Sequence, residues 1–366
     1  MIPRDKLRTR TASAVLATAL LAAVPNATRA GTPFDPAGTE RMALRAEPIE
    51  RFSLRGERRA GELVFLGGLV LRGGGPFFGL SGLERLPGRD AFVAVTDRGH
   101  WIVIDVAREN GRLARASART APMELVGEER RASAVDRDAE AVRLLPDGSA
   151  LVSFERNHRV MAFDPAGRRT GTVPHPVPPH ELRKNGGFEA LAVSPPDSPL
   201  RGAALVIAED SVDERGDLFG GVLSGPRRGV FTVRRTDDFA VTDAAFLPDG
   251  DLVLLERSFR HGISLRMRLR RIAGDTIGPG ARLDGAVLLM AGLSSEIDNM
   301  EGLAVHEDER GTVLTLVSDD NGSFLQRTLL LEFLLPDGAG RLDGVPSAVS
   351  GPVPVPRMRP APRGAA

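Results

Sequence analysis

The sequence has no cysteine and no tyrosine, one tryptophan, and only two lysines, Lys6 and Lys184. The absence of cysteine excludes disulfide bonds, thiol catalysis, thiolate metal sites and a lipoprotein anchor. Lysine plus arginine equals aspartate plus glutamate, at 48 residues each. No net charge therefore attracts the chain to nucleic acid or to an anionic membrane. We expect a monomer with no nucleic-acid partner, stabilised by its own core.

Glycine and proline are abundant, at 41 and 27 residues, and they separate short apolar segments typical of strands. The clearest segment covers residues 297–324, where two apolar strands are joined by a turn and carry acidic residues at both outer ends. Four weaker copies precede it, at residues 77–106, 138–167, 186–211 and from residue 240. This repetition indicates a repeat protein.

The residues that begin the first strand of each copy align as Ser81, Glu140, Glu189, Asp243 and Glu301. Their separations of 59, 49, 54 and 58 residues are close to the length of a propeller blade. The sequence therefore predicts an all-β fold, a single β-propeller with four-stranded antiparallel blades. We expect six blades, the last one combining N-terminal strands near residues 44–72 with the C-terminal part. Five blades is the alternative.

The N-terminus is typical of an export signal. Four basic residues precede an alanine-rich apolar run at residues 12–24, which is too short to span a bilayer stably. We expect a signal peptide at residues 1–30, one propeller domain at 31–344, and a disordered proline-rich tail at 345–366. The mature protein is then periplasmic or secreted, with no stable membrane span.

A hairpin returns the second strand to the edge where the first began, so the acids of every blade are expected to meet at one end of the axis. The second strands end at Asp97, Glu155, Glu209, Glu256 and Asp319. Crowded carboxylates repel one another unless a cation lies among them. Oxygen donors without thiolates favour Ca²⁺. The predicted metal ligands are Glu140, Glu189 and Glu301, assisted by Asp243, Asn299 and Asp319.

Three arginines directly follow strand-end acids and are predicted to bind an anionic group of the substrate: Arg98, Arg156 and Arg257. His100 and His158 follow two residues later and are candidates for general acid or base catalysis. A divalent ion can polarise a carbonyl or phosphoryl oxygen for hydrolysis. The alternative interpretation is structural, because acids can also cap strands or pair with neighbouring arginines.

Several motifs occur in a recognisable order between about residues 60 and 336: GLSGLE, VTDRGHW, DAEAV, SFERNHRV, GGFEALAV, NMEGLAV and SDDN. In this order they resemble the phytase-like family, described by the esterase-like activity of phytase. The resemblance implies an exported bacterial β-propeller. β-Propeller phytases, to which the family is similar, bind calcium in acidic clusters and hold phosphate with several lysines, whereas Lys184 is the only lysine after the signal.

Our first hypothesis is a calcium-dependent hydrolase that acts on a small anionic or ester substrate, either an ester or a phosphoester, in the central pocket. A second is a non-catalytic periplasmic binding module for an anionic ligand or an envelope polymer. A calcium-dependent lactonase is the third.

Overall fold

The computed structural model describes residues 32–54, 56–125, 133–260 and 264–340. The expected signal peptide and proline-rich tail lie outside the described residues and stay predictions. Within these ranges no helix has the length and apolar character needed to cross a membrane. The helical elements are short: α1 (Ala134–Arg137), η1 (Gly75–Phe77), η2 (Pro179–Glu181) and η3 (Gly274–Thr276).

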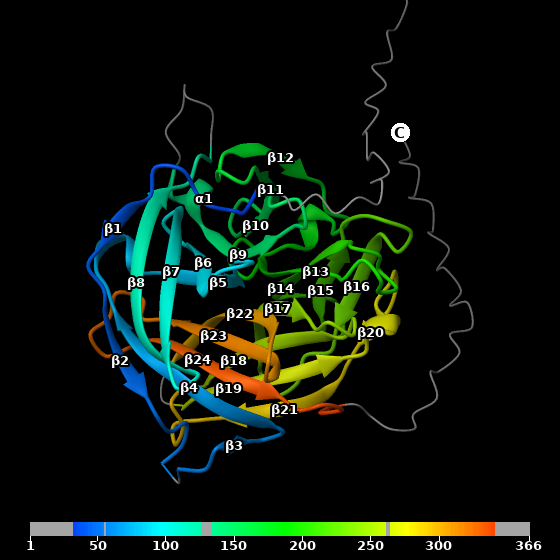
Figure 1. The fold of residues 1–366 in the computed structure, drawn as a ribbon. Helices are drawn as coiled ribbons and strands as arrows, with labels where there is room; N and C mark the ends of the chain where they lie inside the picture. The colour runs from blue at the N-terminus through cyan, green and yellow to red at the C-terminus, as the bar shows by residue number, and fades with distance from the viewer. Residues whose placement is uncertain (1–31, 55, 126–132, 261–263, 341–366) are drawn as a thin grey trace, which may run out of the picture. The chain divides into compact units, whose positions relative to one another are not determined.

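The described strands form five separate sheets, and consecutive strands pair antiparallel from the inner strand outward (Figure 1). The first sheet contains β5 (Leu80–Arg85), β6 (Ala91–Thr96), β7 (His100–Glu109), β8 (Arg112–Pro122) and the edge strand β1 (Glu40–Met42). The second contains β9 (Ala139–Leu144), β10 (Ala150–Phe154), β11 (Arg159–Phe163) and β12 (Arg169–Val173).

The third sheet contains β13 (Phe188–Val193), β14 (Ala204–Val212), β15 (Leu218–Val222), β16 (Gly229–Val233) and the short parallel strand β20 (Arg282–Leu283). The fourth contains β17 (Ala240–Phe246), β18 (Leu252–Arg260), β19 (Ser264–Ile272) and β21 (Ala286–Ala291). The fifth contains β22 (Asn299–Asp308), β23 (Gly311–Asp319), β24 (Thr328–Leu335), β4 (Leu63–Arg72), β2 (Arg45–Ile49) and β3 (Arg59–Ala60).

The inner strands pack in a closed circle, in the order β5, β9, β13, β17, β22 and back to β5. Five separate apolar clusters lie between successive sheets, and each cluster draws residues from two neighbouring sheets. The protein is therefore a five-bladed β-propeller. The all-β propeller is confirmed, the expectation of six blades is wrong, and the alternative of five is confirmed.

The N-terminal strands complete the fifth blade and do not form a sixth. β4 pairs antiparallel with β24, with Leu69 opposite Leu330 and Gly68 opposite Leu331. Gly68 allows a close approach at this seam, because a Cβ there would lie 2.8 Å from the carbonyl oxygen of Leu330. The two ends of the domain are thus joined in one sheet, which closes the circle without an open edge between them.

A cluster of three phenylalanines stabilises this closure. Phe333 is fully buried and meets Phe52 edge-on, with ring centroids 5.0 Å apart, while its centroid lies 5.4 Å from that of Phe65. Aromatic pairs of this geometry contribute beyond their buried area.

Replacing Phe333 with alanine is expected to lower the free energy of unfolding by about 3–5 kcal/mol, the usual cost of a phenylalanine-sized cavity. The matched control is Phe324→Ala, because Phe324 is 95% exposed and its loss should change stability by less than about 0.5 kcal/mol. Urea unfolding of both variants measures the difference. Equal stabilities would show that the seam between β24 and β4 does not hold the domain closed.

Candidate functional site

Each inner strand has a β-bulge near its start. The register with the second strand skips one inner residue in every blade, and the skipped residues are Gly82, Glu140, Glu189, Thr242 and Glu301. A bulge residue is left out of the ladder, and bulges of this kind re-aim side chains beside functional sites. Three of the five positions hold glutamate, so the repeat places three carboxylates at equivalent positions near one end of the axis.

This register corrects the alignment made from the sequence at two positions. Thr242 and Gly82, and not Asp243 and Ser81, occupy the bulge, and a shift of one residue turns a side chain to the other face. The carboxylate of Asp243 is fully buried and accepts from Arg143 Nη2 at 2.7 Å and from the backbone N–H of Leu303 at 2.8 Å. Asp243 is therefore part of a structural ion pair, apart from the other predicted metal ligands.

The second strands bring further acids to the same end. Glu155 donates its backbone N–H to the carbonyl of Asp138 at 2.9 Å, and Glu209 donates likewise to Gly187 at 2.8 Å. Asp319 pairs with Asn299 in the fifth blade. In these three blades the acid lies opposite the residue two positions before the bulge. In the first blade the corresponding residue is Leu80, and its partner is Thr96, so Asp97 comes one residue later.

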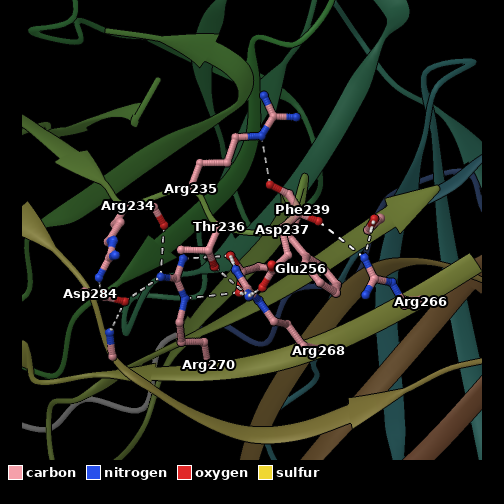
Figure 2. Close-up of polar contacts among 12 residues, drawn as sticks. Arg234, Arg235, Thr236, Asp237, Phe239, Glu256, Arg266, Arg268, Arg270 and Asp284 are labelled. Carbon is pink, nitrogen blue, oxygen red and sulfur yellow. Dashed lines mark hydrogen bonds and ion pairs between the residues drawn. The ribbon is translucent and has the colours of Figure 1, made fainter. Parts of the chain in front are cut away.

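The fourth blade differs, because its register places Arg257 where the second, third and fifth blades carry an acid. Glu256 lies one residue earlier, opposite Val241, and Figure 2 shows its side chain between Arg268 and Arg270. Its fully buried carboxylate accepts from Arg268 Nε at 2.6 Å and from Arg270 Nη2 at 2.7 Å. The expectation that Glu256 would join the other acids is therefore wrong.

Six carboxylates from the second, third and fifth blades form what we call the acidic cluster: Asp138, Glu140, Glu155, Glu189, Glu209 and Glu301. Two triads within it, Asp138–Glu140–Glu155 and Glu155–Glu189–Glu209, each bring three carboxylate oxygens within 4.8 Å of one another. Glu155 belongs to both triads. One oxygen of Glu155 also accepts from the backbone N–H groups of Gly186 and Gly187, which holds the carboxylate in place.

Sequence reasoning selected Glu140, Glu189 and Glu301 and did not assign Asp138, Glu155 or Glu209 as ligands. The sequence did contain a signal for these three acids. Glu155 and Glu209 were expected at the ends of second strands, and Asp138 precedes Glu140 by two residues. Asp319 lies nearby, accepts from the backbone N–H of Gly79 at 2.9 Å, and raises the pKa of Glu301 by its charge.

The three predicted substrate-binding arginines differ in their surroundings. Arg257 is largely buried, donates to Glu209 at 3.0 Å, and also donates to Glu301 and Asn299. Arg156 pairs with Asp138 at 2.8 Å and is 41% exposed, while Arg98 is half exposed, 3.7 Å from Asp97. Arg257 is thus an internal partner of the acidic cluster, and the other two leave donors facing solvent.

The two predicted catalytic histidines lie in different surroundings. The buried Nδ1 of His100 has no hydrogen-bond partner, and the ring of His158 packs edge-on against Phe188, with centroids 6.2 Å apart. Within the ranges that the structure describes, neither imidazole hydrogen-bonds to a carboxylate of the acidic cluster. Their role as general acid or base stays a prediction without geometric support.

Burial and repulsion between carboxylates raise the pKa values of Asp138, Glu140, Glu189 and Glu301. Burial raises the pKa of Glu140 and Glu189 well above the usual range, and neighbouring carboxylates raise both further. Burial also raises the pKa of Glu301 to about 7, against the lowering effect of Arg257. The six acids exceed the one buried guanidinium, so either protons or a cation must balance them. An all-oxygen donor set of this charge fits Ca²⁺, which takes six to eight oxygen ligands.

In chelator the protein should lose stability as pH rises. Glu301 has its pKa raised from 4.5 to about 7, so between these values the folded state binds more protons than the unfolded state, and stability falls with pH. The loss between pH 5 and pH 8 is expected to be on the order of 3 kcal/mol. Saturating calcium should remove it, because the ion binds the deprotonated carboxylates.

Urea unfolding in chelator at pH 5, 6.5 and 8 measures this dependence. Glu301→Gln is the matched variant and should have a flatter profile. Burial lowers the pKa of His100, His175 and His306, which opposes the trend, but these groups are common to both proteins and cancel in the comparison. Identical profiles for the two proteins would contradict the raised pKa of Glu301.

Comparison with solved structures gives only distant matches. An aldose sugar dehydrogenase from Streptomyces coelicolor in its PQQ-bound form is 14% identical, with a TM-score of 0.37 over 80% of this chain and 100% of that chain. A glucose dehydrogenase is 13% identical, with a TM-score of 0.37 over 74% and 98% of the two chains. The outer coat vertex of COPII is 9% identical, with a TM-score of 0.38 over 77% and 75%. Such low scores carry no functional argument.

A search of curated proteins finds no match. The family model for phytase-like proteins, described as esterase-like activity of phytase, matches residues 75–322. The matched range runs from the loop before β5 to the end of β23 and includes every residue of the acidic cluster. The chain therefore belongs to the phytase-like family, as its motifs suggested.

Proposed function

We propose that the protein is an exported, calcium-dependent hydrolase of an ester or phosphoester, with the acidic cluster as its site. The observation that carries this proposal is the pair of carboxylate triads that share Glu155 at one end of the propeller axis. Membership of the phytase-like family supports it. Export rests on the signal-like residues 1–30.

The ion would be held by Glu155 with the other members of the two triads, and Glu301, Asn299 and Asp319 would complete its surroundings. When bound, calcium would polarise a carbonyl or phosphoryl oxygen and stabilise developing negative charge. Arg257 keeps Glu209 and Glu301 in position through its hydrogen bonds. The exposed guanidinium groups of Arg98 and Arg156 would hold an anionic part of the substrate.

A non-catalytic binding module remains the second candidate. The lack of a hydrogen-bond partner at Nδ1 of His100 and of His158 favours it, because within the described residues neither nitrogen is joined to the acidic cluster. A calcium-dependent lactonase would use the same ion and the same arginines, so substrate tests must separate it from the first proposal.

Nitrophenyl esters, nitrophenyl phosphates and lactones should be tested with added calcium and with chelator. We expect one class to be turned over only with calcium. For an anionic substrate, the double variant Arg98→Ala/Arg156→Ala should raise KM about tenfold with little change in kcat, as expected when binding of a charged group is lost. Turnover that survives chelation contradicts the proposal, and calcium binding without any turnover favours the binding module.

A further inference from the structure

A cavity, which we call the far cavity, lies at the ends of the inner strands opposite to the acidic cluster. It has a volume of about 410 Å³, and all five inner strands, or the residues that directly follow them, line it. The lining includes Glu84 from β5, Leu144 from β9, Val193 from β13, Ala245 from β17 and Val305 from β22. The acidic cluster lies near the starts of these strands, so this far cavity is a separate site.

The walls of the far cavity are apolar and repeat from blade to blade. The turn after each of the first four inner strands contributes a proline: Pro87, Pro146, Pro195 and Pro248. Leu145, Phe246 and Leu247 add further apolar surface. The fifth blade departs from the repeat and contributes His306 and the exposed Glu307. Apolar walls with a few polar groups are the usual composition of a small-molecule site.

Arg143 lies at the base of the far cavity and links three blades. Its guanidinium donates to the carbonyl oxygens of Leu83 at 3.0 Å, Ala244 at 2.7 Å and Leu303 at 3.1 Å. It also pairs with Asp243 at 2.7 Å. Most N–H donors of the Arg143 guanidinium are therefore bound to oxygen atoms of the protein itself.

Glu84 is only partly compensated by Arg143, because burial raises its pKa to about 7 although Arg143 lowers it. The Glu84 carboxylate lies 3.5 Å from Arg143 Nη1, a longer contact than the 2.7 Å pair with Asp243. Two carboxylates thus share one guanidinium. The other lining cation, Arg85, is held by Asp90 at 3.0 Å and by the carbonyl of Ala91 at 2.9 Å. Burial lowers the pKa of His306, so this imidazole adds no positive charge at neutral pH.

A second observation points to a polar ligand. Ser194 lines the far cavity and is only 2% exposed, yet its hydroxyl has no hydrogen-bond partner. Buried polar atoms are nearly always paired, so unpaired ones in a cavity wall are expected to meet a ligand or water.

From these features we propose that the far cavity binds a small primary amine, with its aliphatic chain between the prolines and its ammonium group on Glu84. Ser194 is the second acceptor for the ammonium hydrogens. An ammonium group stabilises the ionised form of Glu84, whereas this ionised form repels a carboxylate or a phosphate and is left uncompensated by a neutral molecule. This site is independent of the proposed hydrolytic function, because it shares no residue with the acidic cluster.

Calorimetric titration with hexylammonium, in saturating calcium, tests the proposal. We expect saturable binding at one site, with hexanol and hexanoate at least tenfold weaker. Glu84→Gln should weaken hexylammonium binding at least tenfold, while Glu189→Gln, at the opposite end, should change it less than twofold. The reverse pattern would place the ammonium in the acidic cluster and overturn the proposal.

One further variant and one further ligand test the proposal if Glu84→Gln folds poorly. Val305→Trp fills the cavity from the β22 side and should abolish binding without moving a charge. A lysine-containing peptide presents the same ammonium from a protein and should bind at least tenfold more weakly than hexylammonium. Binding that survives Val305→Trp, or a preference for the peptide, would contradict a small-molecule amine site.

Discussion

Glu155→Gln is expected to weaken calcium binding at least a hundredfold, which is about 2.7 kcal/mol of binding free energy. Glu155 is the one carboxylate shared by both triads, so the change removes a charge from each. Its oxygen also accepts from the N–H groups of Gly186 and Gly187, and the amide oxygen of glutamine can keep those bonds. The loss should therefore fall on the ion and leave the fold intact. Calorimetric calcium titration measures it.

The matched control is Glu109→Gln, because Glu109 is an exposed residue on β7, 62% exposed, and lies outside the acidic cluster. We expect its calcium affinity to equal that of the natural protein. If any calcium-dependent turnover is found, Glu155→Gln should lose it in the same proportion at limiting calcium. Unchanged affinity in Glu155→Gln would remove the shared carboxylate from the site.

Glu256→Leu is expected to cost about 3–5 kcal/mol of unfolding free energy, because it leaves two buried guanidinium groups without their carboxylate. Arg268 and Arg270 are each only 2% exposed, and both donate two hydrogen bonds to Glu256. Figure 2 shows Arg270 also reaching Asp284, and Arg268 reaching Thr236. These remaining contacts place the loss toward the lower part of the range.

The triple variant Glu256→Leu/Arg268→Met/Arg270→Leu should recover most of that stability. Replacing a whole buried ionic group by apolar residues is often neutral, whereas removing one partner is costly. Chemical unfolding of the single and triple variants separates the two effects. A single variant that loses less than about 1 kcal/mol would show that the buried arginines do not depend on Glu256.

Much of the fold follows from the repeated pattern. Alternating apolar strands and proline-glycine turns predict the propeller, and the expectation that strands near residues 44–72 join the C-terminal part agrees with the pairing of β4 with β24. Blade number was wrong because these strands were counted as part of an extra blade. Only the pairing of Leu69 with Leu330 shows that β4 is the fourth strand of a blade that already has three.

The candidate site was predictable where the bulge falls on a repeated glutamate. Glu140, Glu189 and Glu301 align correctly, since the apolar strands that follow them are similar. Asp243 was misplaced by one residue, because a bulge shifts the face of a side chain without leaving a clear mark in the sequence. For the same reason Glu256 was predicted at the position that Arg257 occupies. The direction of His158 depends on packing against Phe188 in the next blade, which no local pattern encodes.

The central claim is that the acidic cluster is a calcium site, and the most direct measurement is metal content together with thermal melting of the purified protein, with chelator and with added calcium. We predict one stoichiometric ion and a melting temperature that falls when it is removed, as linkage requires for a ligand of the folded state. No bound metal, together with the same melting temperature in chelator and in calcium, would contradict the claim and leave the acids as a proton-sharing structural network.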